Sequence, residues 1–168
     1  DPALIQRAVE EKYAPVQFAE HYARVPARLY DLRGGTLLSL AKVKLVFEPI
    51  GISMSVKNLF GLIPGPSRGK YHGAEHAVLD QNIVDINKVY RSLFAVKGLV
   101  EAVHTAADHA VEAERPLTLA GCGAAFASQD TIALDAFITA ACVRDPYGVG
   151  HLRLAAQTFG NWDAKLCE

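Results

Sequence analysis

Two segments rich in Leu and Val flank a long stretch of helical periodicity, and this alternation constrains the fold more than any other feature of the sequence. Residues 37–47 (LLSLAKVKLVF) are typical of a buried or half-buried strand, and residues 95–103 (AVKGLVEAV) favour a strand, with a helix as the alternative. Between them, an apolar face predicts a helix over 75–94. Strands separated by helices predict an α/β layered domain with a small mixed, partly parallel sheet and flanking helices.

The remaining segments divide into shorter helices, one further strand and a turn. Helical periodicity begins at Leu4 and again at Phe18, and Asn82 and Asp85 on the long helix are expected to be solvated. Ser53 or Ser55 is the expected N-cap of the helix that begins near residue 55. The other expected elements are a strand over 116–128, a helix over 132–140, a turn over 145–148 and a last helix from about 149 to Gly160.

Composition limits the classes of function that the chain can have. The 168 residues are 51% hydrophobic and 21% charged, which fits one domain over residues 1–168 that needs neither disulfides nor a structural metal. The net charge is −1 and the pI is near 6.7, so no overall basic field favours nucleic acid or an acidic membrane as a partner.

Cysteine usage and the absence of long apolar runs indicate a cytoplasmic protein. Cys122, Cys142 and Cys167 are odd in number and widely spaced, as expected of reduced thiols, and no CxxC pair suggests an iron–sulfur cluster or a zinc ribbon. Neither a signal peptide nor a membrane span is expected. Because the chain begins with Asp1 rather than Met, a processed or truncated piece with a missing N-terminal segment stays an open alternative.

The segment SVKNLFGLIPGPSRGKYHGAEH, residues 55–76, concentrates cations and imidazoles. Lys57 falls in the first turn of the expected helix, where the helix dipole disfavours a cation. A bound anion there would convert this penalty into attraction, with Asn58 as a further donor and with Arg68 and Lys70 on the following glycine-rich loop. The structural alternative is that Lys57 extends to solvent and the glycines only form turns.

His72, Glu75 and His76 spell HxxEH, the inverted zinc-protease pattern. This pattern requires a helix that presents both histidines on one face, and Gly73 weakens that helix. A loop histidine beside a helix-capping acid is the alternative. The neighbouring PGPSRGKY resembles a phosphate-binding P-loop, but it lacks the first glycine and the Ser/Thr hydroxyl of that motif.

Two aspartates in the C-terminal part are further candidates. Asp130 is expected to cap a helix. Asp135 lies in the apolar stretch TIALDAFITAA, so it needs a partner, either a Lys or Arg from elsewhere or the hydroxyls of Thr131 and Thr139. His104, His109 and His151 have no ligand spacing and are expected to be surface or satisfied core residues.

SVKNLFGLIPGPSRGKYHG, followed about 55 residues later by ASQDTIALDAFITAACVRDPYGVGHLRLAAQTFGNWD, resembles the family known as domain of unknown function 362. The resemblance covers roughly residues 37–163. It implies an α/β domain without an agreed activity, in a family that includes proteins fused to ferredoxin-type iron–sulfur modules. This chain has no such cysteine motif, so any redox role needs a partner. Position by position, the resemblance marks Lys57, Asn58, Gly61, Arg68, His72, Asp130 and Asp135.

Together these features predict a site for a small carboxylate or phosphate ligand. Lys57, Asn58, Arg68, Lys70 and Asp130 are the predicted ligand-binding residues. If the chain is an enzyme, which the sequence leaves open, His72 or Asp135 would be the acid or base. No cofactor or metal is assigned to this site. The alternatives are a non-catalytic scaffold for an iron–sulfur protein and, third, a zinc hydrolase built on HxxEH; an oligomer is also allowed.

Overall fold

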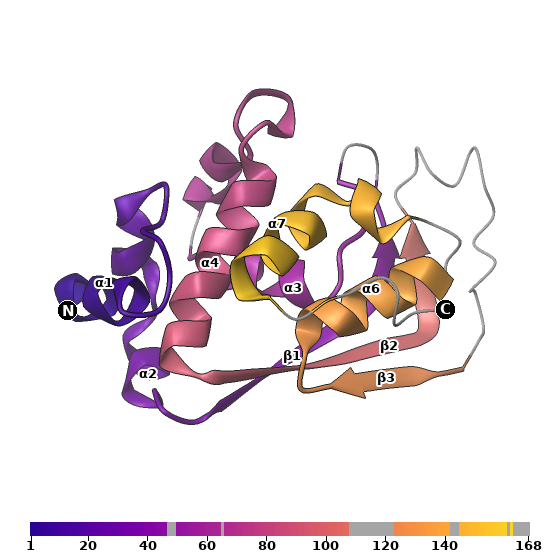
Figure 1. Cartoon of the computed structure of the whole chain (residues 1–168), viewed down its shortest axis with the longest axis horizontal. Coiled ribbons are helices and arrows are strands. Elements are labelled where there is room, and N and C mark those ends of the chain that lie inside the picture. The colour runs from indigo at the N-terminus through magenta and orange to yellow at the C-terminus, as the bar shows by residue number, and fades with distance from the viewer. Residues whose placement is uncertain (47–49, 65, 108–122, 142–144, 161, 163–168) are drawn as a thin grey trace.

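The computed structural model describes residues 1–46, 50–64, 66–107, 123–141, 145–160 and 162 (Figure 1). The three cysteines and His109 lie outside these residues, as does the side chain of His104. The elements in chain order are α1 (Pro2–Glu10), η1 (Ala19–Arg24), α2 (Ala27–Asp31), β1 (Thr36–Leu45), α3 (Ser55–Asn58), η2 (Leu59–Leu62), η3 (Pro66–His72), η4 (Ala74–His76), α4 (Leu79–Leu93), β2 (Ala95–Ala107), β3 (Ala125–Ser128), α6 (Thr131–Ala141), η5 (Pro146–Gly148) and α7 (Gly150–Phe159).

The three strands form one mixed sheet in the order β1-β2-β3. β1 and β2 are parallel, with Thr36 opposite Ala95, and the long helix α4 lies between them in the chain. β3 pairs antiparallel with β2, with Ser128 opposite Gly98. The predicted α/β class with a small, partly parallel sheet is therefore confirmed, and residues 95–103 belong to a strand. Of the strand predicted over 116–128, residues 125–128 are a strand and 116–122 lie outside the described residues.

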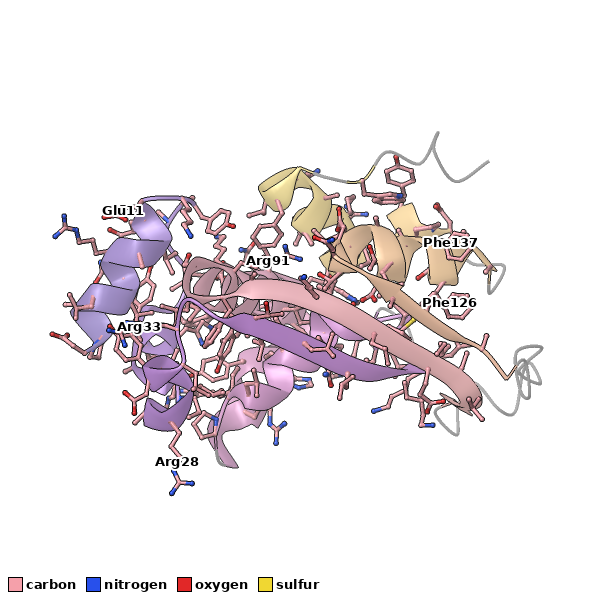
Figure 2. All side chains as sticks on the ribbon, turned by 90° about the horizontal axis from the view of Figure 1, so that it is seen from below. Glu11, Arg28, Arg33, Arg91, Phe126 and Phe137 are labelled. Carbon is pink, nitrogen blue, oxygen red and sulfur yellow. The ribbon has the colours of Figure 1, made fainter. Side chains whose placement is uncertain are left out.

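The helices cover one face of the sheet. Figure 2, seen from below, shows the strands in front of the helices. Ser39 and Val43 of β1 are buried, whereas Leu38 and Leu40 are 48% and 62% exposed. This alternation is expected of a strand that is covered on one side.

Close approach of helices to the sheet depends on Gly98 of β2. A Cβ atom at this position would lie 2.7 Å from Leu134 Cδ2 of α6 and 3.2 Å from Ser55 Oγ of α3. A larger residue would therefore push two helices away from the strand. The missing side chain lets α3 and α6 meet over the middle of the sheet.

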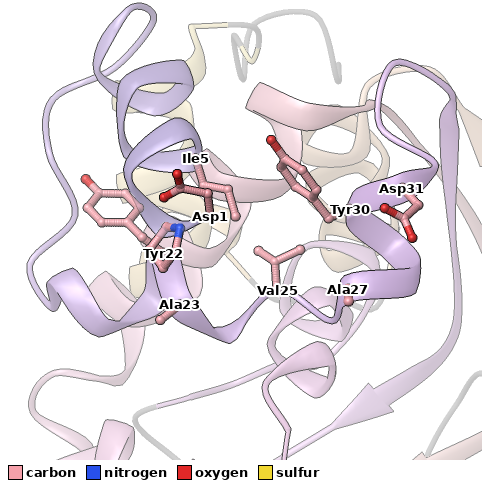
Figure 3. A pocket seen from close by; sticks show the side chains of 9 residues that line it. Asp1, Ile5, Tyr22, Ala23, Val25, Ala27, Tyr30 and Asp31 are labelled. Carbon is pink, nitrogen blue, oxygen red and sulfur yellow. The ribbon is translucent and has the colours of Figure 1, made fainter.

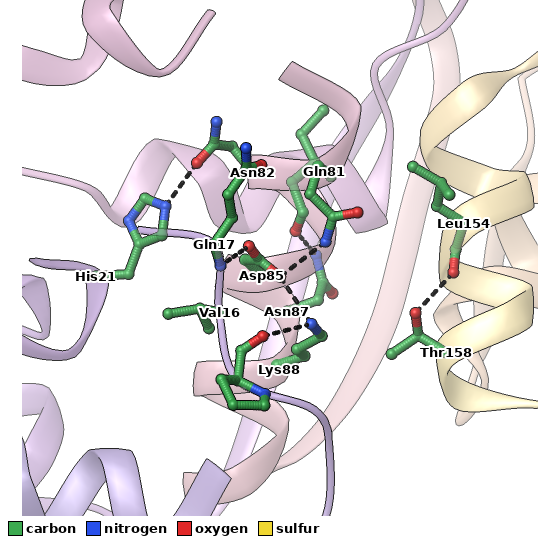
Figure 4. Close-up of polar contacts among 12 residues, drawn as sticks. Val16, Gln17, His21, Gln81, Asn82, Asp85, Asn87, Lys88, Leu154 and Thr158 are labelled. Carbon is green, nitrogen blue, oxygen red and sulfur yellow. Dashed lines mark hydrogen bonds and ion pairs between the residues drawn. The ribbon is translucent and has the colours of Figure 1, made fainter. Parts of the chain in front are cut away.

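The long helix α4 is buried on more than one side, which differs from the expectation that Asn82 and Asp85 are solvated. Both side chains are fully buried by the N-terminal segment (Figure 4). Asp85 accepts from the Gln17 backbone N–H at 2.7 Å and pairs with Lys88 Nζ at 2.8 Å. Asn82 Oδ1 lies 2.7 Å from His21 Nε2. Helical periodicity identifies the apolar face of α4, but it does not indicate that the N-terminal segment packs on the polar face of the same helix.

The turn at Asp145 and the helix end at Gly160 are both formed as their local sequence predicts. Asp145 Oδ1 accepts from the Tyr147 N–H at 2.9 Å and starts the predicted turn. α7 ends at Gly160, which has the left-handed conformation with φ 79°. Arg91 of α4 reaches this region and stacks over the ring of Phe159 at 4.7 Å (Figure 2). Among the described residues, no helix combines the length and the apolar character needed to cross a membrane.

Candidate functional site

The four-residue helix α3 is held by three other elements, and this determines where Lys57 lies. From β1, the Ser39 hydroxyl donates to the Ser55 carbonyl at 2.9 Å. From α4, Asn87 Nδ2 donates to the Val56 carbonyl at 2.9 Å. A helix this short is not stable alone, so these contacts and the contact from α6 described next fix its position.

The negative group at the start of α3 is the chain's own Asp135, from α6. Its Oδ1 accepts from the Ser55 backbone N–H at 3.0 Å and from the Ser55 hydroxyl at 2.5 Å, and its Oδ2 accepts from the Val56 N–H at 2.8 Å. The expectation of a serine N-cap is wrong: Met54 occupies the cap position, and Ser55 is the first helical residue. Asp135, 80 residues away, does what a local cap would do, because a carboxylate satisfies two unpaired amide groups.

Burial raises the pKa of Asp135 to about 7, although the hydrogen bonds from Ser55 and Val56 and the charge of Arg91 act in the opposite direction. A protonated Asp135 still fits this site, since its O–H can donate to Ser55 Oγ. The Ser55 hydroxyl then donates to the Thr131 carbonyl, 3.3 Å away. Both protonation states therefore have hydrogen-bond partners.

This pKa predicts a pH dependence of stability. At pH values between 3.8, the ordinary pKa of an aspartate, and about 7, Asp135 is protonated in the folded chain and ionised in the unfolded chain. The contribution of Asp135 to the free energy of unfolding is therefore full below pH 4 and is lost as the pH rises through 7. Urea denaturation at pH 5 and pH 8 should show this contribution in the wild type and not in Asp135→Asn.

Three histidines have a lowered pKa and change the free energy of unfolding in the opposite direction, namely His21, His72 and His151. As the pH falls below 6.5, they take up protons in the unfolded chain before they do so in the folded chain, so the stability falls. The comparison with Asp135→Asn removes their contribution, since the variant keeps all three. If the wild type and the variant had the same pH dependence, the raised pKa would be wrong.

Lys57 does not point into bulk water. Its side chain is partly buried, and burial together with the charge of Lys44 lowers its pKa, whereas the charge of Asp80 raises it. The ammonium is thus partly desolvated with a second cation nearby. Such an ammonium gains from any anion that approaches it.

Arg68 and His72 fold back onto η2, which continues directly from the helix of Lys57. Arg68 Nη1 lies 3.5 Å from the Gly61 carbonyl, and the His72 ring packs edge-on against Phe60 at 5.6 Å. Phe60 follows Lys57 by three residues, so these two side chains lie on the same side of this helical stretch.

We call Lys57, Arg68 and His72 the cationic cluster. The pKa of His72 is lowered by burial and then by the charges of His76, Lys57 and Arg68, in agreement with this placement. Lys57 and Arg68, which are predicted to bind the ligand, therefore lie close enough to His72, the predicted acid or base, for their charges to act on it.

A histidine that was expected to be a surface or satisfied core residue, His151, lies beside the cationic cluster with an aspartate that the sequence did not single out, and it is buried without a hydrogen-bond partner of good geometry among the described residues. His151 Nδ1 in the first turn of α7 is 3.4 Å from Asp80 Oδ1 in the first turn of α4. The charge of Asp80 raises the pKa of Lys57, and the charge of Lys57 lowers that of His151. Gly150 permits this contact, because a Cβ atom there would lie 1.9 Å from Asp80 Oδ2.

His151 is fully buried, and neither ring nitrogen has a hydrogen-bond partner with good geometry among the described residues. Burial lowers its pKa, against the opposing effect of Asp80. A neutral imidazole beside a carboxylate can hold a proton for transfer. Asp80 and His151 are 71 positions apart and share no motif, which explains why sequence patterns do not predict this pair.

His72 and His76 meet through the same nitrogen of each ring. The two Nδ1 atoms are 2.9 Å apart and the ring centroids are 5.0 Å apart. The segment is not the regular helix that HxxEH needs, since Glu75 and His76 have φ of 50° and 62°. Two such non-glycine residues cost together about 2–4 kcal/mol, whereas one neutral hydrogen bond contributes about 1 kcal/mol. The hydrogen bond between the rings therefore does not account for this backbone.

A family model described as Domain of unknown function (DUF362) matches residues 4–140. The chain belongs to the DUF362 family. The match begins well before residue 37, where the sequence motifs alone placed the start of the resemblance. No curated protein and no solved structure matches the chain.

The two sequence blocks that carry the DUF362 resemblance meet at Asp135. The first block contains α3 and the second contains α6, and the hydrogen bonds from Ser55 and Val56 to Asp135 join them. Thr139 donates to the Asp135 backbone carbonyl at 2.6 Å. Asp135 thus positions the helix of Lys57 and is itself fully buried.

Three other predicted ligand-binding residues have structural partners. Asn58 Nδ2 donates to the Leu40 carbonyl of β1 at 3.0 Å. Lys70 Nζ pairs with Glu20 at 2.7 Å, and this pair raises the pKa of Lys70. Asp130 caps α6 as the structural alternative expected, because its Oδ1 accepts from the N–H groups of the second and third helical residues at 2.9 and 3.1 Å.

A separate cavity of about 160 Å³ lies between the start of α1 and α2 (Figure 3). Tyr22 and Tyr30 line it together with Asp1 and Asp31, and no predicted site residue borders it. Within the part of the chain that the structure describes, no group of three or more His, Cys, Asp or Glu side chains is arranged around one point.

Proposed function

We propose that this DUF362 protein binds a small carboxylate or phosphate at the cationic cluster. The observation that carries the proposal is the return of Arg68 and His72 onto η2, the segment that continues from the helix of Lys57. Two cations and one imidazole then lie close enough for the charges of Lys57 and Arg68 to act on His72, and a small anion balances their charge.

Side chains rather than a helix terminus hold the ligand in this proposal. The Ser55 and Val56 amides already donate to Asp135, so they are not offered to a second anion. Lys57 and Arg68 provide charge, and His72 provides an imidazole whose pKa is lowered and which is neutral at pH 7. If a proton is transferred to or from the ligand, the partly exposed His72 is the group for it, because Asp135 and His151 are both fully buried.

The proposal predicts that small anions raise the melting temperature of the protein. A ligand at one hundred times its Kd stabilises the folded state by about 2.7 kcal/mol, which corresponds to roughly 5–10 °C for a chain of this size. Thermal melts in inorganic phosphate, oxalate and citrate, compared with chloride at equal ionic strength, should show this shift. Lys57→Ala and Arg68→Ala should each lose most of it.

Lys70→Ala is the matched control, because it removes a positive charge from the loop of Arg68 but breaks contacts outside the cationic cluster, the pair with Glu20 and the contact over the Tyr71 ring. It should keep the full shift. An equal response of all three variants would contradict the proposal and attribute the effect to general screening. The alternative role as scaffold for an iron–sulfur protein stays a prediction, which co-purification of such a protein without any anion response would favour.

A further inference from the structure

The geometry of the two imidazoles in residues 72–76 points to a second kind of ligand. We infer that His72 and His76 bind one divalent transition-metal ion through their Nδ1 atoms, with water or a small anion completing the coordination. This goes beyond the anion proposal and does not depend on it. It also differs from the zinc-protease pattern, which needs a helix and a catalytic glutamate.

The separation of the two nitrogens carries the inference. Ligand nitrogens about 2.05 Å from one ion are about 2.9 Å apart when they subtend a right angle at it, and about 3.3 Å apart at the tetrahedral angle. The two Nδ1 atoms are 2.9 Å apart, with the ring edges that carry them facing one another. The arrangement therefore suits neighbouring positions of a square-planar or octahedral ion, Cu(II) or Ni(II), better than tetrahedral Zn(II).

The backbone agrees with this interpretation. Glu75 and His76 both have positive φ, and together with Gly73 they turn the chain so that His76 faces His72. Strained conformations of this kind persist where the surrounding structure or a ligand requires them, and they concentrate at binding sites. Both rings are partly exposed, so an ion can reach them.

The charges of Lys57 and Arg68 allow metal binding to be distinguished from anion binding by experiment. Lys57 and Arg68 lower the pKa of His72 because they repel a positive charge there, and they must repel a metal cation in the same way. Lys57→Ala should therefore bind the ion several-fold more tightly than the wild type. The same substitution should weaken binding of an anion, so the two ligands respond with opposite signs.

The experiment is a titration of chelator-treated protein with CuCl₂, NiCl₂ or ZnCl₂, in a buffer free of phosphate and carboxylates. Calorimetry measures the affinity and the stoichiometry. The nitrogen couplings in the Cu(II) paramagnetic resonance spectrum count the nitrogen ligands. One equivalent of Cu(II) and of Ni(II) should bind, with two coupled nitrogens for Cu(II) and with Ni(II) at least as tight as Zn(II). His72→Asn and His76→Asn, whose amides can keep a hydrogen bond between the two side chains, should lose this binding. Lys70→Ala should keep it.

Melting temperatures without metal establish that the variants are folded. Equal binding by the wild type and by the His72→Asn, His76→Asn double variant would overturn the inference, as would the absence of binding to the wild type. A clear preference for Zn(II) over Ni(II) would overturn the right-angle geometry. Failure of the anion response with intact Cu(II) binding would reject only the proposed function.

Discussion

Replacing Asp135 with Ala will lower the free energy of unfolding by about 3–5 kcal/mol. The substitution leaves two backbone N–H groups and one hydroxyl of α3 without their acceptor, in a place that water does not reach. Each buried group that loses its partner costs about 1–3 kcal/mol. Denaturation in guanidinium chloride measures the change, and the melting temperature should fall by roughly 2–4 °C per kcal/mol.

Two further variants show that the effect belongs to the connection between helices. Asp135→Asn keeps an acceptor for Ser55 but turns an NH₂ group towards the Val56 N–H, so its cost should be smaller than that of Asp135→Ala. Asp130→Ala removes a carboxylate that only caps its own helix, and the cost should be about 1 kcal/mol. If Asp130→Ala and Asp135→Ala were equally destabilising, the long-range cap would have no special importance.

The second large effect is expected at the buried pair of Asp85 and Lys88 (Figure 4). Their side chains are 0% and 6% exposed, and the Gln17 backbone N–H also donates to Asp85. Asp85→Ala removes the counter-charge of the buried Lys88 ammonium, which keeps only the neutral Pro15 carbonyl at 3.3 Å, and it also removes the acceptor of the Gln17 N–H. Breaking such a pair costs about 3–5 kcal/mol, and urea denaturation should show a loss of this size.

The control for this prediction removes both charges. A double variant with Asp85→Leu and Lys88→Met should be more stable than Asp85→Ala, because it leaves no unpaired charge in the interior. Glu11→Ala breaks the exposed pair with Arg7, whose side chains are 79% and 61% exposed, and should change the stability by less than about 0.5 kcal/mol. A loss at Asp85 as small as the one at Glu11 would show that the pair is hydrated in solution.

Features encoded by neighbouring residues could be predicted from the sequence. The apolar periodicity of α4, the turn at Asp145 and the stop at Gly160 depend on residues a few positions apart, and the structure confirms all three. The cap at Asp130 belongs to the same group. The grouping of Lys57 with Arg68 and His72 was also accessible, since one short segment contains all three.

Features that depend on distant segments could not be predicted. Asp135 was recognised as a buried carboxylate in need of a partner, but periodicity gives no indication that the partner is the start of a helix 80 residues earlier. Asp85 was placed in solvent because the layer that covers it comes from the N-terminal segment. Asp80 and His151 meet only because α4 and α7 pack together with Gly150 at the contact.

The attachment of α3 to α6 also bears on the order of folding. Four residues are too few to pass the nucleation barrier of a helix, so the segment with Lys57 cannot become ordered early and by itself. Its amides find their acceptor only after a loop of 80 residues has closed, which is a slow kind of contact to form. Lys57 therefore reaches its place late, when the halves of the chain on either side of the long helix have come together.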